Sequence, residues 1–588
     1  LSVTSLIACG GSNESSSPNP LPTPPTTGSS EPSWSQGTYA ASSTFKNQCA
    51  IPRTNSDIDG NPYPDEQGST LKEKFWLRSW SDELYLWYNE LPDINPDNND
   101  NRLEYFDKLR TSATTTNGTQ KDQFHFTIPT DEYEERVATG SSAGYGANFV
   151  ILAGSPPRDV RVSIVQPNSP ASINNNLLRG TEILEIDGED VINGSNTNTL
   201  NAGLFPSEPG ETHTFLVRDA GSETTRSISL TSDVVAEQPV NTTAIIETPT
   251  GKVGYISFTT FGTSTAEEQI ANAFTQMSNA NISDLVLDLR YNGGGFLAIA
   301  SQLSYMIAGE NQTQGTFFEE LQFNDKHPVT NPVTNTTLEP TPFYTTSLGF
   351  NENFPGGQPL DTVDLPRVFI ISTGGTCSAS EAVINGLRGI DVEVVLIGSR
   401  TCGKPYGFYG TDNCGETYFT IQFRGVNYKN FGDYSDGFAP ENSATIGGVG
   451  EFIPGCVASD DFTNQLGNAN ENMLRTALSY RENGVCPTNQ NKNLLYADKS
   501  KYENNKQKVE MISNNIEMLI LDEFIDNITI FYEQIGKIVH PDYIKENAFI
   551  NKFLDIYRIP NKFTKYNWCI RFELNKMKLI TKHINLDY

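Results

Sequence analysis

Three short segments contain the residue types that nucleophilic catalysis requires. Ser378 stands in the run GGTCSASEAV, just before a predicted helix whose N-terminal dipole and free N–H groups favour negative charge. Gly293 to Gly295 end the run VLDLRYNGGG, and their unobstructed N–H groups are suited to face an oxyanion. Lys404 follows the apolar run VEVVLIG. A serine nucleophile, a lysine base and backbone donors form a set that can transfer acyl groups.

The serine also has an interpretation without chemistry. Ser378-Ala379-Ser380-Glu381 fits a capping box, in which a serine hydroxyl and a glutamate three residues later satisfy backbone donors at a helix start. This stretch alone does not separate an ordinary helix N-terminus from a nucleophile.

Lys404 can act as a base only if it loses its proton near neutral pH. The ordinary lysine pKa of about 10.4 keeps the ammonium charged, whereas desolvation lowers that pKa by up to several units. Cys402, Pro405, Tyr406 and Phe408 surround it in sequence and predict a dry setting. The alternative is a surface lysine in a loop.

The region that must position these residues reads as an α/β layer. Residues 236–487 alternate apolar strands such as KVGYISFTTF, DLVLDLR, RVFIIST and VEVVLIG with amphipathic helices at 265–279, near 297–308 and after 378. The three chemical segments each follow one of these strands, and ligand sites collect at strand carboxyl ends in such sheets. We therefore expect the three segments to meet.

The preceding segment resembles a PDZ domain, and we assign residues 140–235 to it. The resemblance rests on three motifs: Gly144-Tyr145-Gly146-Ala147, the run PNSPA at 167–171 and GTEILEIDG at 180–188. It implies that the backbone of residues 144–147 binds a peptide carboxylate beside an open strand edge. A generic small β-domain is the alternative.

The chemical segments resemble the S41 family, the C-terminal processing peptidases. The motifs are DLRYNGGG at 288–295, SASE at 378–381 and GSRTCGK at 398–404, and the resemblance extends over about 70–487. It implies that Ser378 is the nucleophile, that Lys404 is the general base, and that the backbone N–H groups of Gly294 and Ala379 form the oxyanion hole.

One position departs from that family. Many relatives carry a glutamine four residues after the lysine, where it helps to orient the lysine, but this sequence has Phe408. Gln422 and Glu416 are candidate replacements. The resemblance therefore supports a Ser/Lys dyad and no third member.

Neither a serine–histidine protease nor a metal site is favoured. His125, His213 and His327 lie in no motif that places them beside Ser378, so we expect structural or surface roles. The chain has no CxxC motif and five scattered histidines. We expect no metal and no other cofactor.

Calcium is the weaker alternative for one acidic loop. DINPDNNDNRLE at 93–104 has the oxygen-ligand spacing of an EF-hand, from Asp93 to Glu104. Asn98 replaces the usual glycine, however, and an acidic connection between two helices, at 71–90 and 103–111, explains the loop as well.

The amino-terminal residues predict export. Leu6-Ile7-Ala8-Cys9 resembles a lipoprotein lipobox with Cys9 as the lipidated residue, so residues 1–8 are interpreted as the remnant of a signal peptide. The following Ser/Pro-rich residues 9–45 suit a tether. An ordinary cysteine in a disordered tail is the alternative. We expect a membrane contact only through this anchor, in an exported lipoprotein that faces the periplasm or the cell exterior.

Six of the eight cysteines suit disulfide bonds in an exported protein, with Cys9 as the anchor and Cys569 in an atypical tail. Six cysteines allow 15 connectivities. The pairs closest in sequence are Cys402–Cys414 and Cys456–Cys486, and we take these as the expectation.

The last hundred residues differ in composition from the rest. Residues 489–588 contain 13 of the lysines and one glycine, Gly536, of the 47 in the chain. An appended helical module and a joining artefact both explain this break, and we assign no role to residues 488–588.

The sequence therefore predicts an α/β protease core at 236–487 with an inserted mainly-β PDZ-like domain and a helical N-terminal domain at 46–138. The net charge of −30 argues against a nucleic-acid partner. We expect a serine endopeptidase that acts on proteins or peptides with free C-termini. The alternatives are a catalytically silent PDZ-type binding protein and a crotonase-like acyl-transfer enzyme. The sequence does not indicate an oligomeric state.

Overall fold

The computed structural model describes residues 31–115, 117–487 and 518–519. The predicted lipidation site Cys9, the signal remnant and almost all of the tail at 488–588 lie outside the described residues.

The amino-terminal segment begins with a long helix. α1 (Thr70–Leu84) starts after Ser69, whose hydroxyl accepts the Lys72 amide at 3.2 Å. The predicted helix over 71–90 is therefore confirmed except for its last turns. The helix ends because Tyr85 leaves the helical conformation (φ −59°, ψ 131°) and its buried hydroxyl donates to Asp122 at 2.7 Å.

The apolar face of α1 packs against residues from much later in the chain. Trp76 and Trp80 stack at 5.2 Å, and the Tyr418 ring lies 5.3 Å from Trp76. Tyr418 belongs to β21 (Glu416–Phe419), which pairs antiparallel with β3 (Phe126–Pro129). The second helix, predicted over 103–111, is present but shorter, as α2 (Arg102–Asp107), which begins with a capping box from Asn101 and Glu104.

Residues 141–236 form a separate β-rich layer, and the first and last strands of this segment lie side by side. β4 (Ser141–Gly144) pairs antiparallel with β11 (Asp233–Ala236). Between them a sheet has the order β10-β9-β7-β6-β5. Its strands are β5 (Ala147–Ala153), β6 (Asp159–Val165), β7 (Glu182–Ile186), β9 (Thr212–Arg218) and β10 (Thr225–Thr231), with β8 (Glu189–Asp190) beside β7.

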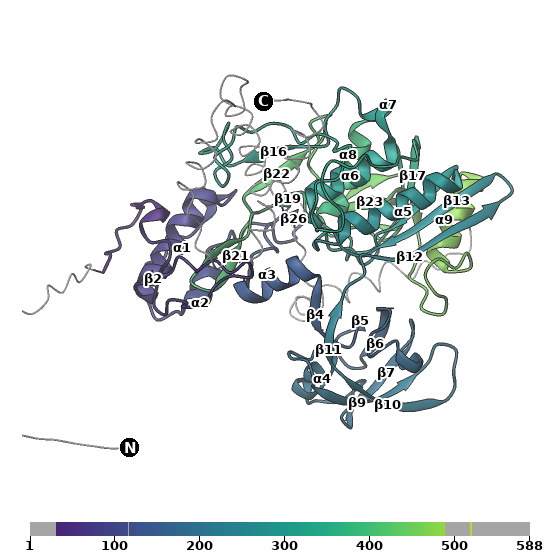
Figure 1. The fold of residues 1–588 in the computed structure, drawn as a ribbon, viewed down its shortest axis with the longest axis horizontal. Helices are drawn as coiled ribbons and strands as arrows, with labels where there is room; N and C mark the ends of the chain where they lie inside the picture. Colours follow the sequence, from purple (N-terminus) through teal and green to yellow (C-terminus); the bar gives the residue numbers. More distant parts are fainter. Residues whose placement is uncertain (1–30, 116, 488–517, 520–588) are drawn as a thin grey trace, which may run out of the picture. The chain divides into compact units, whose positions relative to one another are not determined.

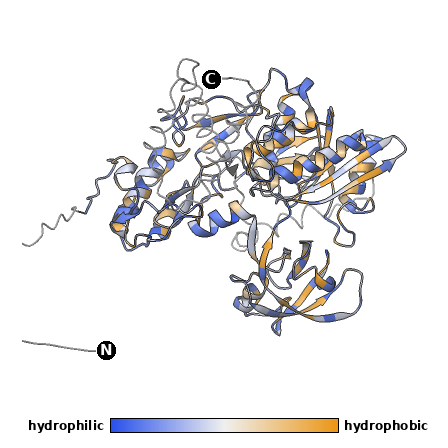
Figure 2. Cartoon of the chain, in the orientation of Figure 1, coloured by the Kyte–Doolittle hydropathy of each residue, from blue (hydrophilic) through white to orange (hydrophobic). Residues whose placement is uncertain are grey.

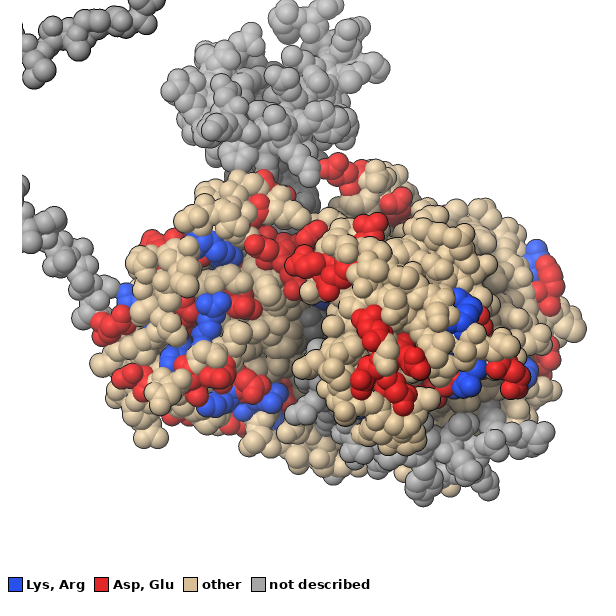
Figure 3. Space-filling view, turned by 90° about the horizontal axis from the view of Figure 1, so that it is seen from below, with Lys and Arg blue, Asp and Glu red and all other residues tan. Residues whose placement is uncertain are grey.

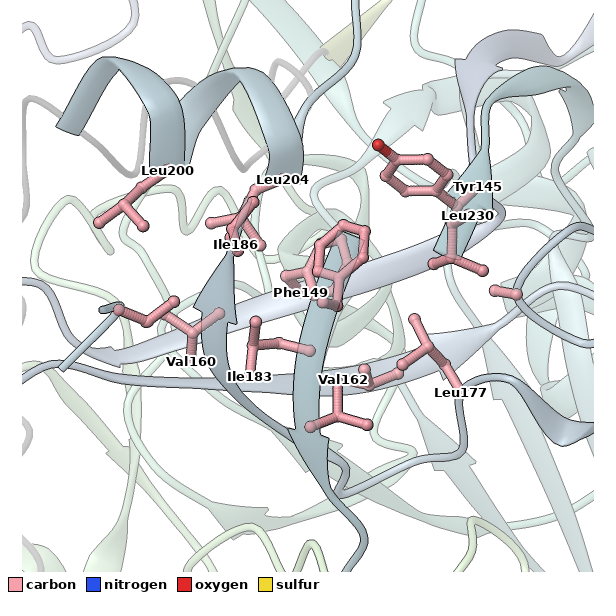
Figure 4. Close-up of a cluster of buried hydrophobic side chains, with 14 residues drawn as sticks. Tyr145, Phe149, Val160, Val162, Leu177, Ile183, Ile186, Leu200, Leu204 and Leu230 are labelled. Atoms are coloured by element: carbon pink, nitrogen blue, oxygen red, sulfur yellow. The ribbon is translucent and has the colours of Figure 1, made fainter. Parts of the chain in front are cut away.

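The helix α4 (Thr197–Leu204) closes the core of this layer. Figure 4 shows Leu200 and Leu204 projecting from α4 toward Phe149 and the strands that carry Val160 and Ile183. These side chains are all buried. The alternation of apolar residues along the strands places this one face of the sheet in the core.

The largest sheet holds the segments singled out by the sequence. Its order is β12-β13-β14-β17-β18-β25, antiparallel between β12 and β13 and parallel from β13 onward. The strands are β12 (Val240–Thr248), β13 (Gly251–Phe258), β14 (Asp284–Asp288), β17 (Arg367–Ser372), β18 (Glu393–Gly398) and β25 (Gly455–Val457).

Helices cover both faces of this sheet (Figure 1). On one face, α9 (Asn472–Asn483) buries Met473 and Leu474 against Val253 and Phe369. The other face carries the mutually packed helices α5 (Ala266–Ala280), α6 (Leu297–Ala308) and α8 (Ala379–Gly389). The predicted α/β layer is confirmed.

The remaining elements are short. They are the helices α3 (Thr130–Thr139) and α7 (Glu310–Thr313), the 3-10 helices η1 (Ser42–Thr44), η2 (Tyr88–Glu90), η3 (Ile173–Asn175) and η4 (Glu441–Ile446), and the strands β1 (Gln48–Cys49), β2 (Glu66–Gln67), β15 (Gly295–Phe296), β16 (Glu320–Phe323), β19 (Tyr406–Gly407), β20 (Thr411–Asn413), β22 (Phe423–Val426), β23 (Phe438–Pro440), β24 (Glu451–Ile453) and β26 (Met518–Leu519).

The distribution of polarity fits this layering. Figure 2 shows hydrophobic residues along the strands of the large sheet, whereas α3 is mainly hydrophilic. On the face shown in Figure 3, acidic side chains gather in several groups, in line with 71 acidic against 41 basic residues in the chain. Within the described ranges, no helix is both long and apolar enough to cross a membrane.

Candidate active site

Three loops meet at the carboxyl ends of the adjacent strands β14, β17 and β18. The loop after β14 carries Gly293 to Gly295, the loop after β17 leads into Ser378, and the loop after β18 carries Lys404. Hydrogen bonds join them in sequence: the Cys377 amide donates to the Asn292 carbonyl at 3.1 Å, and the Cys402 amide donates to the Thr376 carbonyl at 3.0 Å. The expected convergence of the three segments is confirmed.

Ser378 has the backbone conformation of a sharp turn. It is the N-cap of α8, with φ 59° and ψ −118°, and it is completely buried. A positive φ is uncommon for a residue with a β-carbon and is strained unless its surroundings enforce it. The turn places the serine at the mouth of α8, where the helix dipole favours negative charge.

The Ser378 hydroxyl is not used to cap the helix. Ser378 and Glu381 have the arrangement of a capping box, and the Glu381 carboxylate accepts the Ser378 amide at 3.0 Å. However, the Glu381 amide donates to the Ser378 carbonyl at 2.8 Å, and the Ser378 Oγ has no hydrogen-bond partner among the described residues. A buried hydroxyl without a partner is costly and calls for an explanation beyond helix capping.

The second serine of the motif has a structural partner. The Ser380 hydroxyl is also buried, but it donates to the Asn292 carbonyl at 3.0 Å. Ser380 thereby ties the start of α8 to the loop after β14. The two serines are equivalent in type and different in environment.

Glu381 holds the main chain of both candidate catalytic residues. One carboxylate oxygen, Oε2, accepts the amides of Ser378 at 3.0 Å and Lys404 at 2.8 Å. The other oxygen accepts the Thr401 hydroxyl at 2.5 Å and the Gly403 amide at 2.8 Å. Burial raises the pKa of this carboxyl above its ordinary value. The local sequence predicts only a capping role for Glu381, because its partners at 401–404 lie about 20 residues away.

Lys404 lies in an aromatic and completely buried setting. Its Nζ is 4.0 Å from the ring centre of Phe408 and 5.0 Å from that of Phe124. Phe408, at the position of the family's glutamine, is therefore a wall of the lysine pocket. The aromatic faces attract the charged ammonium, while the removal of water disfavours it.

The two candidate replacements for that glutamine have other partners. The Gln422 amide clamps the backbone of Tyr409, accepting its N–H and donating to its carbonyl, both at 3.2 Å. Glu416 lies 3.7 Å from Arg102. Neither contact supports a third catalytic member.

The two amides that are expected to form the oxyanion hole differ in their hydrogen bonding. The Ala379 amide, at the first position of α8, has no hydrogen-bond acceptor within residues 31–115 and 117–487. The Gly294 amide instead donates to the Asn292 side chain at 2.9 Å. Gly294 and Gly295 both have positive φ, and a β-carbon on Gly295 would lie 2.3 Å from the Gly262 nitrogen. These positions need glycine, and the amide of Gly294 is turned toward Asn292.

The disulfide pairing is partly different from the expectation. Cys456–Cys486 is confirmed, but the pair Cys402–Cys414 is wrong. Cys402 bonds to Cys377, because the adjacent strands β17 and β18 end beside each other. Cys414 bonds to Cys49, since β21 packs on the amino-terminal segment.

The acidic loop at 93–104 uses its carboxylates within the protein. Asp93 accepts Arg78 at 2.6 Å, Asp100 accepts Lys108 at 2.6 Å, and Glu104 caps α2. The calcium alternative receives no support from these contacts. In the described ranges, the one cluster with metal-ligand geometry is Cys377, Glu381 and Cys402, whose cysteines form the disulfide.

The three described histidines are engaged elsewhere. His125 is buried between the Thr420 hydroxyl and the Phe106 carbonyl, and burial lowers its pKa. His213 binds Asp187 at 2.6 Å, and His327 contacts the Glu83 carbonyl at 3.1 Å. These contacts agree with the expected structural roles.

The predicted carboxylate-binding residues connect β4 to β5. Gly146 has φ 72°, and a β-carbon there would lie 2.2 Å from that of Ser169, so this turn needs glycine. The Tyr145 side chain is buried and packs 5.6 Å from Phe215, and its carbonyl accepts the Ala171 amide at 2.9 Å, so a carboxylate could bind only to backbone N–H groups of this turn. Beside the turn, β5 is the terminal strand of its sheet among the described residues.

A small pocket lies between this edge strand and α4. Its lining includes the apolar residues Ile151, Val160, Leu200 and Leu204 and also Arg158. An apolar pocket between an open strand edge and a helix is the usual setting for an added peptide strand.

An ionic network that sequence reasoning missed joins the β-rich layer to the loop after β14. Arg179 donates to the Tyr291 hydroxyl at 2.7 Å and to Asp460 at 2.5 Å, and Asp460 also accepts Arg290 at 2.7 Å. Although burial alone raises it, Arg290 and Arg179 hold the pKa of Asp460 below its ordinary value. Tyr291 directly precedes Asn292, so the network reaches the glycine loop.

The region that carries these loops is similar to known proteins. Residues 252–407 match the family model of peptidase family S41. The chain is 26% identical over 277 residues to a carboxyl-terminal-processing protease of Picosynechococcus, covering 46% of this chain and 56% of that protein. It is also 26% identical over 301 residues to the chloroplastic carboxyl-terminal-processing peptidase 3 of Arabidopsis thaliana, covering 48% and 50%. The chain thus spans about half the length of these curated relatives.

A solved structure supports the fold. A protein of Bacteroides fragilis NCTC 9343 assigned to the S41 proteases superposes with a TM-score of 0.52 at 22% identity, over 72% of this chain and 98% of that one. At this identity the likeness concerns the fold alone.

Proposed function

We propose, on the match of residues 252–407 to the model of peptidase family S41, that this chain is a serine endopeptidase with Ser378 and Lys404 as its catalytic pair. The observation that carries the proposal is the Ser378 hydroxyl on a strained helix N-cap, which is buried and has no hydrogen-bond partner among the described residues. The carboxylate of Glu381 binds the main chain of both residues, which keeps their backbones close together.

The chemistry follows from these positions. Ser378 Oγ attacks the peptide carbonyl while its proton passes to a neutral Lys404 Nζ. The tetrahedral intermediate collapses as that proton moves to the leaving amine, which gives an acyl-serine. Water then attacks the ester, Lys404 takes its proton, and collapse of the second intermediate returns the proton to Ser378.

The oxyanion would be bound by the amides of Ala379 and Gly294. The Ala379 amide lies directly after the nucleophile, at the positive end of α8. The Gly294 amide requires that the Asn292 side chain release it, because it now donates there. We propose that substrate binding exchanges this hydrogen bond for one to the substrate oxygen.

The choice of substrate distinguishes the proposed endopeptidase from the alternative crotonase-like acyl-transfer enzyme. The full chain is expected to hydrolyse an unfolded protein and to leave a short acyl thioester intact at the same enzyme concentration. Fragment analysis by mass spectrometry and thiol release measure the two reactions. Thioester turnover without peptide cleavage would favour the crotonase-like alternative.

We further propose that the β-rich layer, as a PDZ-like domain, captures the substrate C-terminus. The backbone of residues 144–147 would bind the carboxylate, and the peptide would extend along β5 toward the pocket beside α4. The contacts of Arg179 with Tyr291 and Asp460 give this domain a direct link to the glycine loop.

Capture predicts that a free carboxylate matters. Amidating the C-terminus of a peptide substrate is expected to raise KM about tenfold or more, because charge-assisted bonds to backbone amides are lost. Acetylation of the N-terminus of the same peptide is the matched control and should leave KM within about twofold. Equal KM values for the amide and the acid would exclude capture through the carboxylate.

Export is a further proposal. Three disulfides within the described part suit an oxidising compartment, as expected for a protein anchored through Cys9 on the outer side of a membrane. The natural substrates would then be other exported proteins.

A further inference from the structure

We propose that the Cys377–Cys402 disulfide is a positioning device that sets Ser378 against Lys404. This inference rests on the proposed catalytic pair. Cys377 directly precedes Ser378, and Cys402 is separated from Lys404 by Gly403 alone. The covalent bridge thus joins the two catalytic loops within two residues of each catalytic side chain.

The disulfide lies next to two residues with unusual backbone conformations. Ser378 keeps a positive φ of 59°, a conformation that persists only when neighbouring structure enforces it. On the other loop, Gly403 has φ 88°, and a β-carbon there would lie 2.4 Å from the Ser435 carbonyl oxygen. Both of these turns with positive φ are adjacent to a half-cystine.

Hydrogen bonds also tie the two loops together. The Cys402 amide donates to the Thr376 carbonyl at 3.0 Å, and the Cys402 Sγ lies 3.3 Å from Glu381 Oε2. That same oxygen accepts the amides of Ser378 and Lys404. If the loops separate, water reaches the carboxylate and the lysine together.

Loss of the bridge therefore has two expected effects. The nucleophile and base spend less time in reacting geometry, which lowers kcat. Water also enters the lysine pocket, so Lys404 is less desolvated and needs a higher pH to lose its proton. A disulfide that only stabilised the fold would produce neither effect in the folded enzyme.

The chain provides a matched control for this test. The Cys456–Cys486 disulfide spans 30 residues and the Cys377–Cys402 disulfide spans 25, so the chain-entropy model predicts similar losses of stability. Each pair also joins one completely buried and one half-buried cysteine. Cys486 follows α9, on the sheet face opposite α8.

The experiment compares C377A/C402A with C456A/C486A in the full chain. We expect both variants to melt at similarly lowered temperatures, while kcat on an unfolded protein falls at least tenfold only in C377A/C402A. In that variant the rising limb of the pH–kcat/KM profile is expected to move to higher pH. A C377A/C402A enzyme with the kcat and pH profile of the control would overturn the proposal.

Chemical reduction of the wild-type disulfide is a second test, which applies even if the C377A/C402A variant does not fold. Dithiothreitol transfers two electrons and two protons to the bridge, which leaves two protein thiols and the cyclic disulfide of the reductant. Thiol labelling with peptide mapping follows reduction at Cys377 and Cys402, of which Cys402 is half-buried. We expect activity to fall in step with labelling at these two positions and to return on reoxidation. Full labelling with unchanged activity would contradict the proposal.

The design separates this inference from the proposed function. If the wild-type chain shows no cleavage that depends on Ser378, the proposed function fails before the cysteine variants are considered. If wild-type cleavage depends on Ser378 and the C377A/C402A enzyme matches the control, only the positioning role fails.

Discussion

Ser378→Ala is expected to abolish cleavage of an unfolded protein, with kcat falling by roughly 10⁴-fold or more, as for other enzymes that lose a catalytic serine. The reason is that the Ser378 hydroxyl lies buried at the mouth of α8 and has no hydrogen-bond partner in the part of the chain that the structure describes. The measurement is a time course of fragment formation, with a thermal melt to show that the variant is folded.

Ser380→Ala is the matched control. It removes a hydroxyl of the same type two residues away, but that hydroxyl binds the Asn292 carbonyl. The expected cost is about 1 kcal/mol of stability from one lost hydrogen bond, with most of the activity kept. An inactive Ser380→Ala beside an active Ser378→Ala would move the nucleophile by two residues. Full activity in both variants would favour a different site.

Lys404→Arg is expected to be inactive although it keeps the positive charge. A guanidinium does not lose its proton in proteins, so it cannot accept one from Ser378. In the wild type, activity should rise with pH, because only the deprotonated fraction of Lys404 acts as a base and this fraction grows as the pH passes the lysine's pKa. The pH–kcat/KM profile measures this, and no histidine titration should contribute to it.

Lys404→Met serves as the control for size and charge. It keeps an unbranched side chain between Phe124 and Phe408 and should be folded and equally inactive. An arginine variant with substantial activity would remove Lys404 from the mechanism. A wild-type profile that falls with rising pH would contradict a lysine base.

The sequence predicts the convergence of the catalytic segments because each follows an apolar strand. Strands of a parallel sheet end at one edge, so the order β14-β17-β18 was sufficient to gather Gly294, Ser378 and Lys404. The sequence does not predict contacts between residues that are distant from each other along the chain. Glu381 fits a local capping motif, yet its carboxylate reaches Thr401 and the main chain of residues 403–404.

The disulfides follow the same rule. Pairing the cysteines closest in sequence correctly predicts Cys456–Cys486 but wrongly pairs Cys402 with Cys414. The reason is that the arrangement of neighbouring strands, and not the length of the loop, decides which thiols meet. Likewise, nothing local to Arg179 indicates its contact with Asp460, 281 residues later. Such pairs depend on tertiary packing, which single-sequence patterns do not encode.

The packing of Tyr418 on the tryptophans of α1 has a consequence for biosynthesis. The helix and its aromatic face leave the ribosome well before the strand that covers Trp76, which is made 342 residues later. At about 5–20 residues per second, this interval is roughly 20–70 s. During that time the nascent chain carries an uncovered aromatic surface, and its amino-terminal part completes its core only after the segment at 411–419 has been synthesised. For such a chain, folding of the amino-terminal part is a late event. A chaperone that binds exposed aromatic residues would therefore stay bound longest to this part of the chain.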